Sequence, residues 1–301
     1  MKTSILAIAA GLAALLSGPR AEAQTLDTTV AVRAGARLEL QNISGTVQIR
    51  ATRRQDVRIH VEYERARIEI DASPTHVEIR TVPRRGMGDA DYTIEVPAEM
   101  GLTVNAVQSD IDVRDVCGEA ELQSVSGEVR LACARGIVSV QSVSGDVTVS
   151  DVRGRLEATA ISGSLTVTDV RADVAAHSVS GDISLDRVDG QDISAETVSG
   201  DVSFAGPIHD GGRYRFQSHS GDLTVRPDGA LNAIVGVSTF SGDLESDYPV
   251  TLTPGGRRMS PREFEFTVGS GNARLSLGSF SGTIYLRRGA AAGREEEEEQ
   301  R

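Results

Sequence analysis

Apolar and polar residues alternate in short runs along almost the whole chain. In residues 147–150, Val147 and Val149 fall on one side of an extended backbone, and Thr148 and Ser150 fall on the other. This period of two predicts β-strands. Turn residues follow each run closely, which leaves no room for helical crossovers. The pattern therefore predicts an all-β protein of short strands.

Ser-Gly pairs mark an internal repeat. From Gly127 to Gly242 the successive glycines lie 18, 18, 18, 19, 21 and 21 residues apart, and Gly282 follows 40 residues later. A fixed period of this length predicts a solenoid, with coils of 18–21 residues. The predicted turn glycines are Gly45, Gly127, Gly145, Gly163, Gly181, Gly200, Gly221, Gly242 and Gly282.

Stacked coils place equivalent residues ~4.8 Å apart in parallel ladders. Two aliphatic ladders are expected to form the core, and the small side chains in them predict a narrow interior. The first comprises Val129, Val147, Leu165, Ile183, Val202 and Leu223, and the second Leu131, Val149, Val167, Leu185, Phe204 and Val225.

Acidic residues follow most of the turn glycines. They allow two interpretations: carboxylates that bond backbone groups in the turns, or a column of oxygen ligands for calcium. Ser164 interrupts the column, which favours the turn interpretation. The calcium candidates are Asp146, Asp182, Asp201, Asp222 and Asp243.

The repeat does not extend over the whole chain. Residues 24–107 keep the alternation of apolar and polar positions but lack the 18-residue repeat. They therefore predict wider early coils or a small sheet that caps the solenoid. Residues 108–289 form the regular solenoid, continuous with the preceding part. Near its end, residues 264–268 and 273–277 predict a closing hairpin or a wider last coil.

Both ends of the chain are expected to lie outside the fold. Residues 1–23 have a positive start, an apolar run and a small-x-small cleavage site, the pattern of a secretory signal peptide. The apolar run is shorter than the ~18 residues of a membrane span. The mature protein is therefore expected in the periplasm, outside the cell or at its surface. Residues 290–301 contain five consecutive Glu and predict a disordered acidic tail.

Composition excludes several kinds of partner. The chain has 43 acidic and 31 basic residues and a net charge of -12, which disfavours nucleic acid and anionic membranes. Only 6 Phe and 5 Tyr are present and there is no Trp, too few for a conventional aromatic-lined glycan groove. Residues 254–262 form a basic loop, interpreted as a solvated loop with a partner contact as the alternative.

A search for catalytic chemistry finds no motif. No His pair has metal-ligand spacing, and the only Lys is Lys2, in the expected signal peptide. Acids such as Asp186, Asp189 and Asp192 keep a polysaccharide lyase or hydrolase open as an alternative, but nothing singles out one pair. We therefore expect no enzyme activity, no catalytic residue, no resident metal and no cofactor.

Cys117 and Cys133 are the only cysteines. On adjacent coils their offset places the Cα atoms near the ~7 Å limit for a disulfide. An oxidising compartment favours the bridge over two free thiols.

The repeated units resemble a known family. The Val-Ser-Gly-Asp-Val-Thr-Val pattern, the opening at residues 38–45 and the ending at residues 280–284 are similar to the bacterial "putative adhesin" family of β-strand-repeat proteins, a domain of unknown function. The resemblance covers residues 36–288 and implies a right-handed, single-stranded β-solenoid, or β-helix. It transfers no catalytic residue.

Together these observations predict a noncatalytic, exported binding or scaffold protein of the cell envelope. The long rows of outward Ser, Thr, Asp, Glu and Arg would contact an envelope component or another protein, with self-association as a further possibility.

Overall fold

A computed structural model describes residues 24–84, 88–250 and 263–289 of the protein. The expected signal peptide at residues 1–23, the basic loop at 254–262 and the expected tail at 290–301 lie outside these residues.

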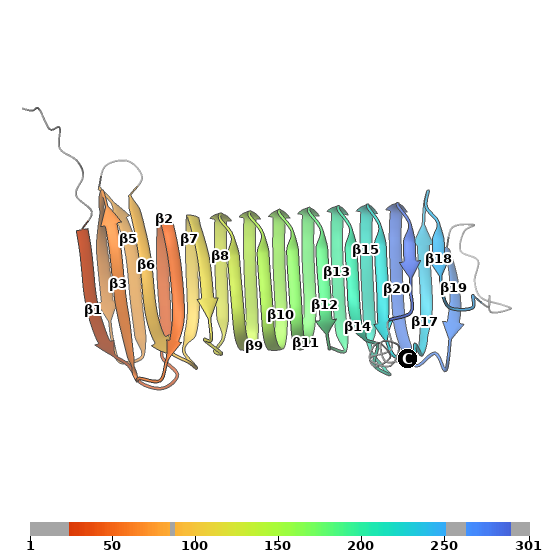
Figure 1. Cartoon of the computed structure of the whole chain (residues 1–301), viewed down its shortest axis with the longest axis horizontal. Helices are drawn as coiled ribbons and strands as arrows, with labels where there is room; N and C mark the ends of the chain where they lie inside the picture. Colours follow the sequence, from red (N-terminus) through yellow and green to blue (C-terminus); the bar gives the residue numbers. More distant parts are fainter. Residues whose placement is uncertain (1–23, 85–87, 251–262, 290–301) are drawn as a thin grey trace, which may run out of the picture.

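The described chain is all-β, and its strands belong to one continuous hydrogen-bonded sheet. The strands stack side by side along the long axis of an elongated molecule (Figure 1). No helix in the described ranges is long and apolar enough to cross a membrane. The strands are β1 (Gln24–Ala31), β2 (Arg37–Thr52), β3 (Asp56–Glu64), β4 (Ala66–Ala72), β5 (His76–Pro83), β6 (Asp89–Pro97), β7 (Gly101–Arg114), β8 (Ala120–Ser126), β9 (Val129–Ser144), β10 (Val147–Ser162), β11 (Leu165–Ser180), β12 (Ile183–Val188), β13 (Asp192–Ser199), β14 (Val202–Pro207), β15 (Arg213–Ser220), β16 (Leu223–Asp228), β17 (Ala233–Thr239), β18 (Leu244–Ser246), β19 (Glu263–Val268), β20 (Ala273–Ser281) and β21 (Ile284–Leu286).

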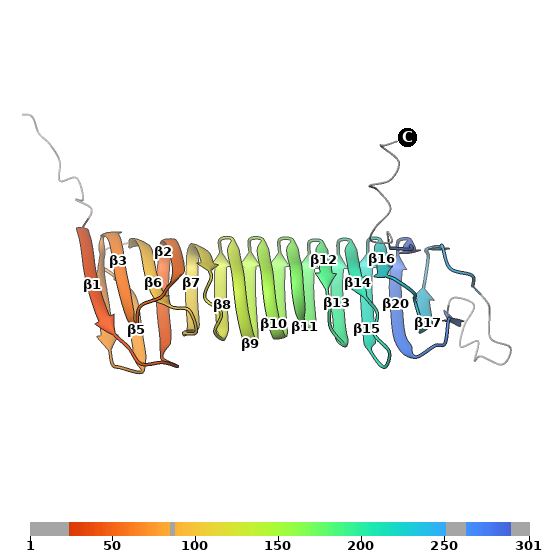
Figure 2. The same ribbon diagram turned by 60° about the horizontal axis from the view of Figure 1, so that its bottom comes forward.

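Parallel pairing in the middle of the molecule follows the repeat. Val147 of β10 pairs with Val129 of β9 on one side and with Leu165 of β11 on the other. The same ladder continues through β12, β14 and β16. Its apolar side chains are buried, as the alternation predicts. Strands from successive repeats lie next to one another in both views (Figure 2).

The turn glycines are required by the stacking of the coils. A Cβ on Gly181, for example, would overlap the carbonyl oxygen of Gly163 on the preceding coil, and φ of Gly181 is 154°. The same close approach recurs along the glycine column. Gly242 also packs against a neighbouring carbonyl, that of Gly282, but without a left-handed φ.

The turn carboxylates bind the next coil. One oxygen of Asp182 accepts a hydrogen bond from the backbone N–H of Asp201 at 2.8 Å, and Asp201 accepts one from Asp222 at 2.8 Å. Asp146 accepts one from the backbone N–H of Ser164 at 2.8 Å. Ser164 has no carboxylate to continue the series to the next coil. The sequence pattern predicted bonds within a turn, and these bonds instead join one coil to the next.

The opposite corner of the coil contains a feature that the sequence analysis missed. Asp115, Cys133, Asp151, Asp169 and Arg187 all have positive φ, between 48° and 71°, and successive members lie 18 residues apart. A left-handed residue turns the chain without a glycine, and Asp tolerates this conformation better than most residues.

Cys117 and Cys133 form a disulfide in the structure, with their Cα atoms 4.9 Å apart. The sequence register placed the Cα atoms farther apart. The corner conformation of Cys133, with φ of 71°, brings the two backbones together.

Removal of this disulfide is expected to lower stability by roughly 3 kcal/mol, because the bridge restricts a short loop in the unfolded chain. Urea unfolding of the C117S/C133S double variant, compared with the oxidised wild type, measures the difference. The reduced wild type is the control and should match the variant. Equal midpoints for oxidised and reduced protein would contradict the prediction.

The N-terminal end is closed by antiparallel strands. β2 continues the parallel stack on β7, while β5 and β6 pair with successive halves of β2. Antiparallel β1, β3 and β4 complete this end. The expected division between residues 107 and 108 falls inside β7.

At the C-terminal end the spatial order differs from the sequence order. β20 pairs with β15 on one side and with β17 on the other, so the later strand lies between the two earlier ones. β19 then pairs antiparallel with β17 at the end of the stack. The expected hairpin between residues 264–268 and 273–277 is therefore wrong: these strands lie on opposite sides of β17 (Figure 1).

The core contains large aromatic residues towards this end. Phe204, Tyr214 and Phe216 are fully buried, and the rings of Phe204 and Phe216 lie 4.9 Å apart. The narrow aliphatic interior predicted from the repeat therefore applies to the middle coils, while these later coils have aromatic residues in their core.

Candidate functional site

An exposed apolar row runs along one face of the molecule, one residue per coil. Each member directly precedes the Ser of a turn or an aligned position, and the strand registers place them next to one another. We call this row the ridge. In spatial order it comprises Ile43, Val107, Val125, Val143, Ile161, Val179, Val198, His219, Phe280 and Phe240.

The ridge side chains are unusually accessible for apolar residues. From Val107 to Val198 they are 41–49% exposed, and Phe280 and Phe240 are 45% and 53% exposed. Isolated exposed apolar residues are ordinary, but a contiguous row of them marks an interaction surface.

A polar row lies parallel to the ridge, two residues earlier on each strand. We call it the polar row: Gln41, Asn105, Gln123, Gln141, Thr159, His177, Glu196 and Gln217. The residue between each pair points into the core; Ser124, Ser142 and Ser218 are buried examples.

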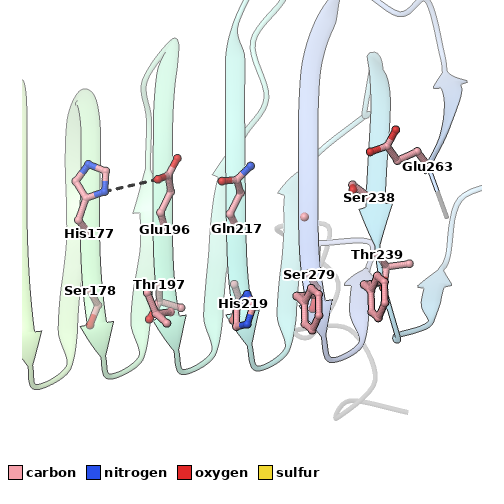
Figure 3. A pocket seen from close by; sticks show the side chains of 15 residues that line it. His177, Ser178, Glu196, Thr197, Gln217, His219, Ser238, Thr239, Glu263 and Ser279 are labelled. Atoms are coloured by element: carbon pink, nitrogen blue, oxygen red, sulfur yellow. Dashed lines mark ion pairs between the residues drawn. The ribbon is translucent and has the colours of Figure 1, made fainter. Parts of the chain in front are cut away.

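The two rows enclose an open groove. Its N-terminal part has a volume of about 540 Å³ and extends from β2 to β10. Its C-terminal part has a volume of about 560 Å³ and extends from β11 to β20 and β17. Figure 3 shows the C-terminal part, with His177, Glu196 and Gln217 in one line above Ser178, Thr197 and His219.

Three rings continue the ridge at the C-terminal end. The His219 and Phe280 rings stack with centroids 4.5 Å apart, and the Phe280 and Phe240 rings stack with centroids 4.6 Å apart. Because β20 lies between β15 and β17, residues far apart in sequence contribute adjacent rings. A low aromatic content predicted no such platform, and only the strand order reveals it.

A hollow adjoins the rings. Two glycines on the outward face, Gly278 of β20 and Gly236 of β17, leave its floor without side chains, and Gln217 and Glu263 flank it. A Cβ on Gly236 would meet nothing within 4 Å, so this glycine borders open space. We call the hollow the basin; its volume is about 500 Å³.

The basin is lined by two acidic residues, Glu263 and Glu265, and titratable side chains of both kinds lie in the pockets next to it. The His177 ring and the Glu196 carboxylate form an ion pair with Nδ1 and Oε2 4.0 Å apart (Figure 3). Glu196 and Arg215 also line an adjoining pocket of about 300 Å³. The site therefore offers acceptors, donors and apolar surface close together.

Beneath the N-terminal part of the groove lies a buried polar cluster. Thr81 donates its hydroxyl proton to Asn42 Oδ1 at 3.0 Å, so the Tyr92 hydroxyl donates to Thr81 at 2.7 Å. The Asn42 amide donates to the Ala90 carbonyl oxygen at 3.0 Å and to Ser109 Oγ at 3.1 Å. Burial raises the pKa of Tyr92 to about 12, so its hydroxyl keeps its proton. The cluster joins the irregular strands to the first regular coils.

The calcium candidates do not converge. Asp146, Asp182, Asp201 and Asp222 each use a carboxylate oxygen for the backbone of the next coil. Asp243 contributes its backbone carbonyl, which accepts from Ile284 at 2.9 Å. Among the residues that the structure describes, no three His, Cys, Asp or Glu side chains are arranged to hold a metal ion.

The three carboxylates considered for a polysaccharide-cleaving enzyme each pair with a different residue. Asp186 pairs with Arg187, Asp189 with His209 at 2.6 Å, and Asp192 with Arg213 at 2.8 Å. Each carboxylate thus has a different cationic or imidazole partner. His209 and His219 are not joined either, since His219 stacks on Phe280 in the ridge.

Comparisons with known proteins concern the family and the fold. The family model described as Toastrack DUF4097 matches residues 36–287. No curated protein matches the chain.

Crystal structures similar to this chain include a "putative adhesin" from Bacteroides fragilis, which is 11% identical with a TM-score of 0.46. The match covers 89% of this chain and 100% of that one. A "putative cell adhesion protein" from Clostridium sporogenes is 9% identical with a TM-score of 0.21, covering 89% and 100% of the two chains. A "putative adhesin" from Parabacteroides distasonis is 11% identical with a TM-score of 0.31, covering 88% and 98%.

Proposed function

The protein belongs to the Toastrack DUF4097 family, and on this premise we propose that it is a noncatalytic, adhesin-like binding module of the bacterial cell envelope. The observation that supports the proposal is the ridge: a contiguous row of exposed apolar side chains beside a polar row, with a groove between them. A surface of this kind is costly to leave in water unless a partner covers it.

The stack makes this surface rigid. Neighbouring coils are joined by parallel backbone pairing and by buried apolar ladders, and several of them also by turn carboxylates. A rigid surface loses little conformational freedom when it binds, which favours affinity. The groove is therefore suited to presenting many weak contacts at once along an extended partner.

Two features of the chain support export from the cytoplasm. The N-terminal pattern predicts a signal peptide, and the Cys117–Cys133 disulfide suits an oxidising compartment. We infer a periplasmic or cell-surface location and, from the usual crossover preference of parallel strands, a right-handed winding of the coils.

End-to-end assembly into a scaffold is disfavoured by charge. The terminal edge strand β19 exposes Glu263 and Glu265, which would meet the same residues of a second copy joined through this end. On the opposite edge strand β1, Asp27 is paired with His60 at 2.7 Å. Like charges on edge strands oppose pairing with another copy. We therefore propose binding to a partner, rather than assembly into a scaffold, as the main role.

The ridge provides the test. In the V125T/V143T/V179T variant, each Val is replaced by an isosteric polar residue, and we expect binding to envelope fractions to weaken by about tenfold or more, because each exchange removes apolar contact area. Co-sedimentation of the purified protein with envelope fractions of its host measures the binding.

A matched control makes the opposite exchange outside the groove. T148V/T166V/T224V changes three outward residues on the strand segments that directly follow the turns, away from the groove, and should bind as the wild type does. Both variants should retain wild-type stability within about 0.5 kcal/mol per exchange. Equal binding by the ridge variant and the wild type would refute the proposed function.

A further inference from the structure

The polar row has a common orientation in the N-terminal half of the groove. The side-chain amides of Gln41 and Gln123 each donate to the Glu two residues earlier on the same strand, at 3.1 and 3.2 Å. The amide of Gln141 donates to Ser139 Oγ at 3.4 Å. Each amide is held in place by one N–H, which leaves its carbonyl oxygen and its second N–H to bond a partner.

Apolar and amide groups therefore alternate across the groove and repeat along it. Every coil offers one ridge side chain and one polar-row side chain, and successive coils lie ~4.8 Å apart. A partner that matches this surface is a polymer whose repeating unit carries both an amide and a small apolar group, at a spacing of one coil or a small whole number of coils.

The dimensions of the ridge argue for a slender partner. Ten residues in single file, at ~4.8 Å per step, extend roughly 43 Å. A strip one side chain wide supplies less than the roughly 800 Å² per partner of a stable protein interface. A second copy of this chain is thus a poor occupant, and a single extended polymer fits better.

The charge of the protein limits which polymers the groove can bind. The chain carries a net charge of -12, which repels polyanions. The N-terminal half of the polar row, from Gln41 to Thr159, has no charged member. A neutral polymer fits this lining better than a polyanion, because the charged groups bonded to the row, Glu39 and Glu121, are acidic and already engaged by its amides.

The basin and the three rings provide a subsite at the C-terminal end. Gln217, Glu263 and Glu265 line the basin and offer acceptors and an amide donor for the hydroxyl groups of a sugar, while Glu196 and Arg215 lie in the adjoining pocket. The rings of His219, Phe280 and Phe240 provide an apolar wall beside them. The bare floor at Gly236 and Gly278 leaves space for a ring-sized group.

We propose that the groove binds a neutral glycan chain whose sugars carry N-acetyl groups, with the basin as its C-terminal subsite. Because successive β-1,4-linked sugars are rotated by about half a turn, the acetamido group of every second sugar would face the groove, at a spacing of roughly two coils. Its methyl group would lie on the ridge and its amide would bond the polar row. The inference rests on the proposed function, because it takes the groove as the binding surface.

The test compares three soluble hexamers on the purified protein by isothermal titration calorimetry. The β-1,4-linked N-acetylglucosamine hexamer should bind saturably. The glucose hexamer, which lacks the acetamido group, and the glucosamine hexamer, which is cationic, should each bind at least about tenfold more weakly. Preferential binding of the glucosamine hexamer would show attraction to the acidic surface and overturn the inference, as would equal binding of all three or binding of none.

A substitution in the basin adds a second criterion. Gly236→Val fills the hollow, and a Cβ at this position meets no atom within 4 Å, so the fold should tolerate it. The affinity for the N-acetylglucosamine hexamer should fall by about tenfold or more, because the new side chain occupies the subsite. Thr166→Val, outside the groove, is the control and should bind as the wild type does. Unchanged affinity of Gly236→Val would overturn the assignment of the basin.

The two proposals fail in different ways. If no hexamer binds but the ridge variant loses envelope binding, the glycan inference is wrong and the proposed function stands. If the ridge variant binds envelope fractions as the wild type does, the proposed function itself is wrong.

Discussion

Replacement of Gly181 by alanine is expected to lower the unfolding free energy by more than about 4 kcal/mol, among the largest effects of a single substitution. The added Cβ would overlap the carbonyl oxygen of Gly163, a backbone atom that cannot rotate away. The φ of 154° at Gly181 adds backbone strain for any other residue. Relief would require the two coils to separate, which breaks their parallel pairing on both sides of the turn.

Urea unfolding followed by circular dichroism measures this effect. Gly236→Ala is the matched control, since the same exchange there places the Cβ in open space. That variant should be neutral or more stable by a few tenths of a kcal/mol, because alanine restricts the unfolded chain. A loss below about 1 kcal/mol for Gly181→Ala would show that the coils can shift to accept a side chain.

Replacement of Phe216 by alanine is expected to cost about 3–5 kcal/mol, the range for a buried aromatic residue that leaves a cavity. Phe216 is fully buried in the aromatic part of the core and packs against Phe204 with ring centroids 4.9 Å apart. Neighbouring side chains are held by the strand ladders on both sides, so the cavity can collapse only in part.

Phe280→Ala is the control for this prediction. Phe280 is 45% exposed and stacks on its neighbours in the ridge, so its removal should cost no more than about 1–1.5 kcal/mol. Denaturant midpoints of the two variants measure the difference. Because each coil contacts only its neighbours, hydrogen exchange of the Phe216 variant should increase most in β13, β15 and β20. Similar midpoints for the two variants would contradict the burial argument.

The groove shows where inference from the sequence reached its limit. Within residues 155–161, the alternation of apolar and polar positions identifies the side chains that point outward. It does not show whether such side chains form an ordinary solvent-exposed row or a contiguous apolar binding surface. Val143 and Ile161 look like ordinary residues before a turn when each coil is considered alone. Their significance follows from stacking, which aligns ten such positions in one row.

The aromatic platform depends even more on tertiary structure. His219, Phe240 and Phe280 are separated by 21 and 40 residues in the sequence, and the repeat suggests that the coil with Phe240 follows the coil with His219. The structure instead places Phe280 between them. Either order satisfies the strand pattern, because a ladder position accepts any strand of matching register.

By itself, the sequence determined the all-β class, the aliphatic ladders and the turn glycines, since each depends on local periodicity or on the repeat register. It favoured a bridge between the two cysteines but left it open, and the corner conformation of Cys133 decides it. Only the tertiary structure decided the order of the last strands, the coil-to-coil role of the turn carboxylates and the shape of the groove. The physical reason is that these features arise from contacts between residues distant in sequence, where many pairings share the same local pattern and the packing of the whole stack selects one of them.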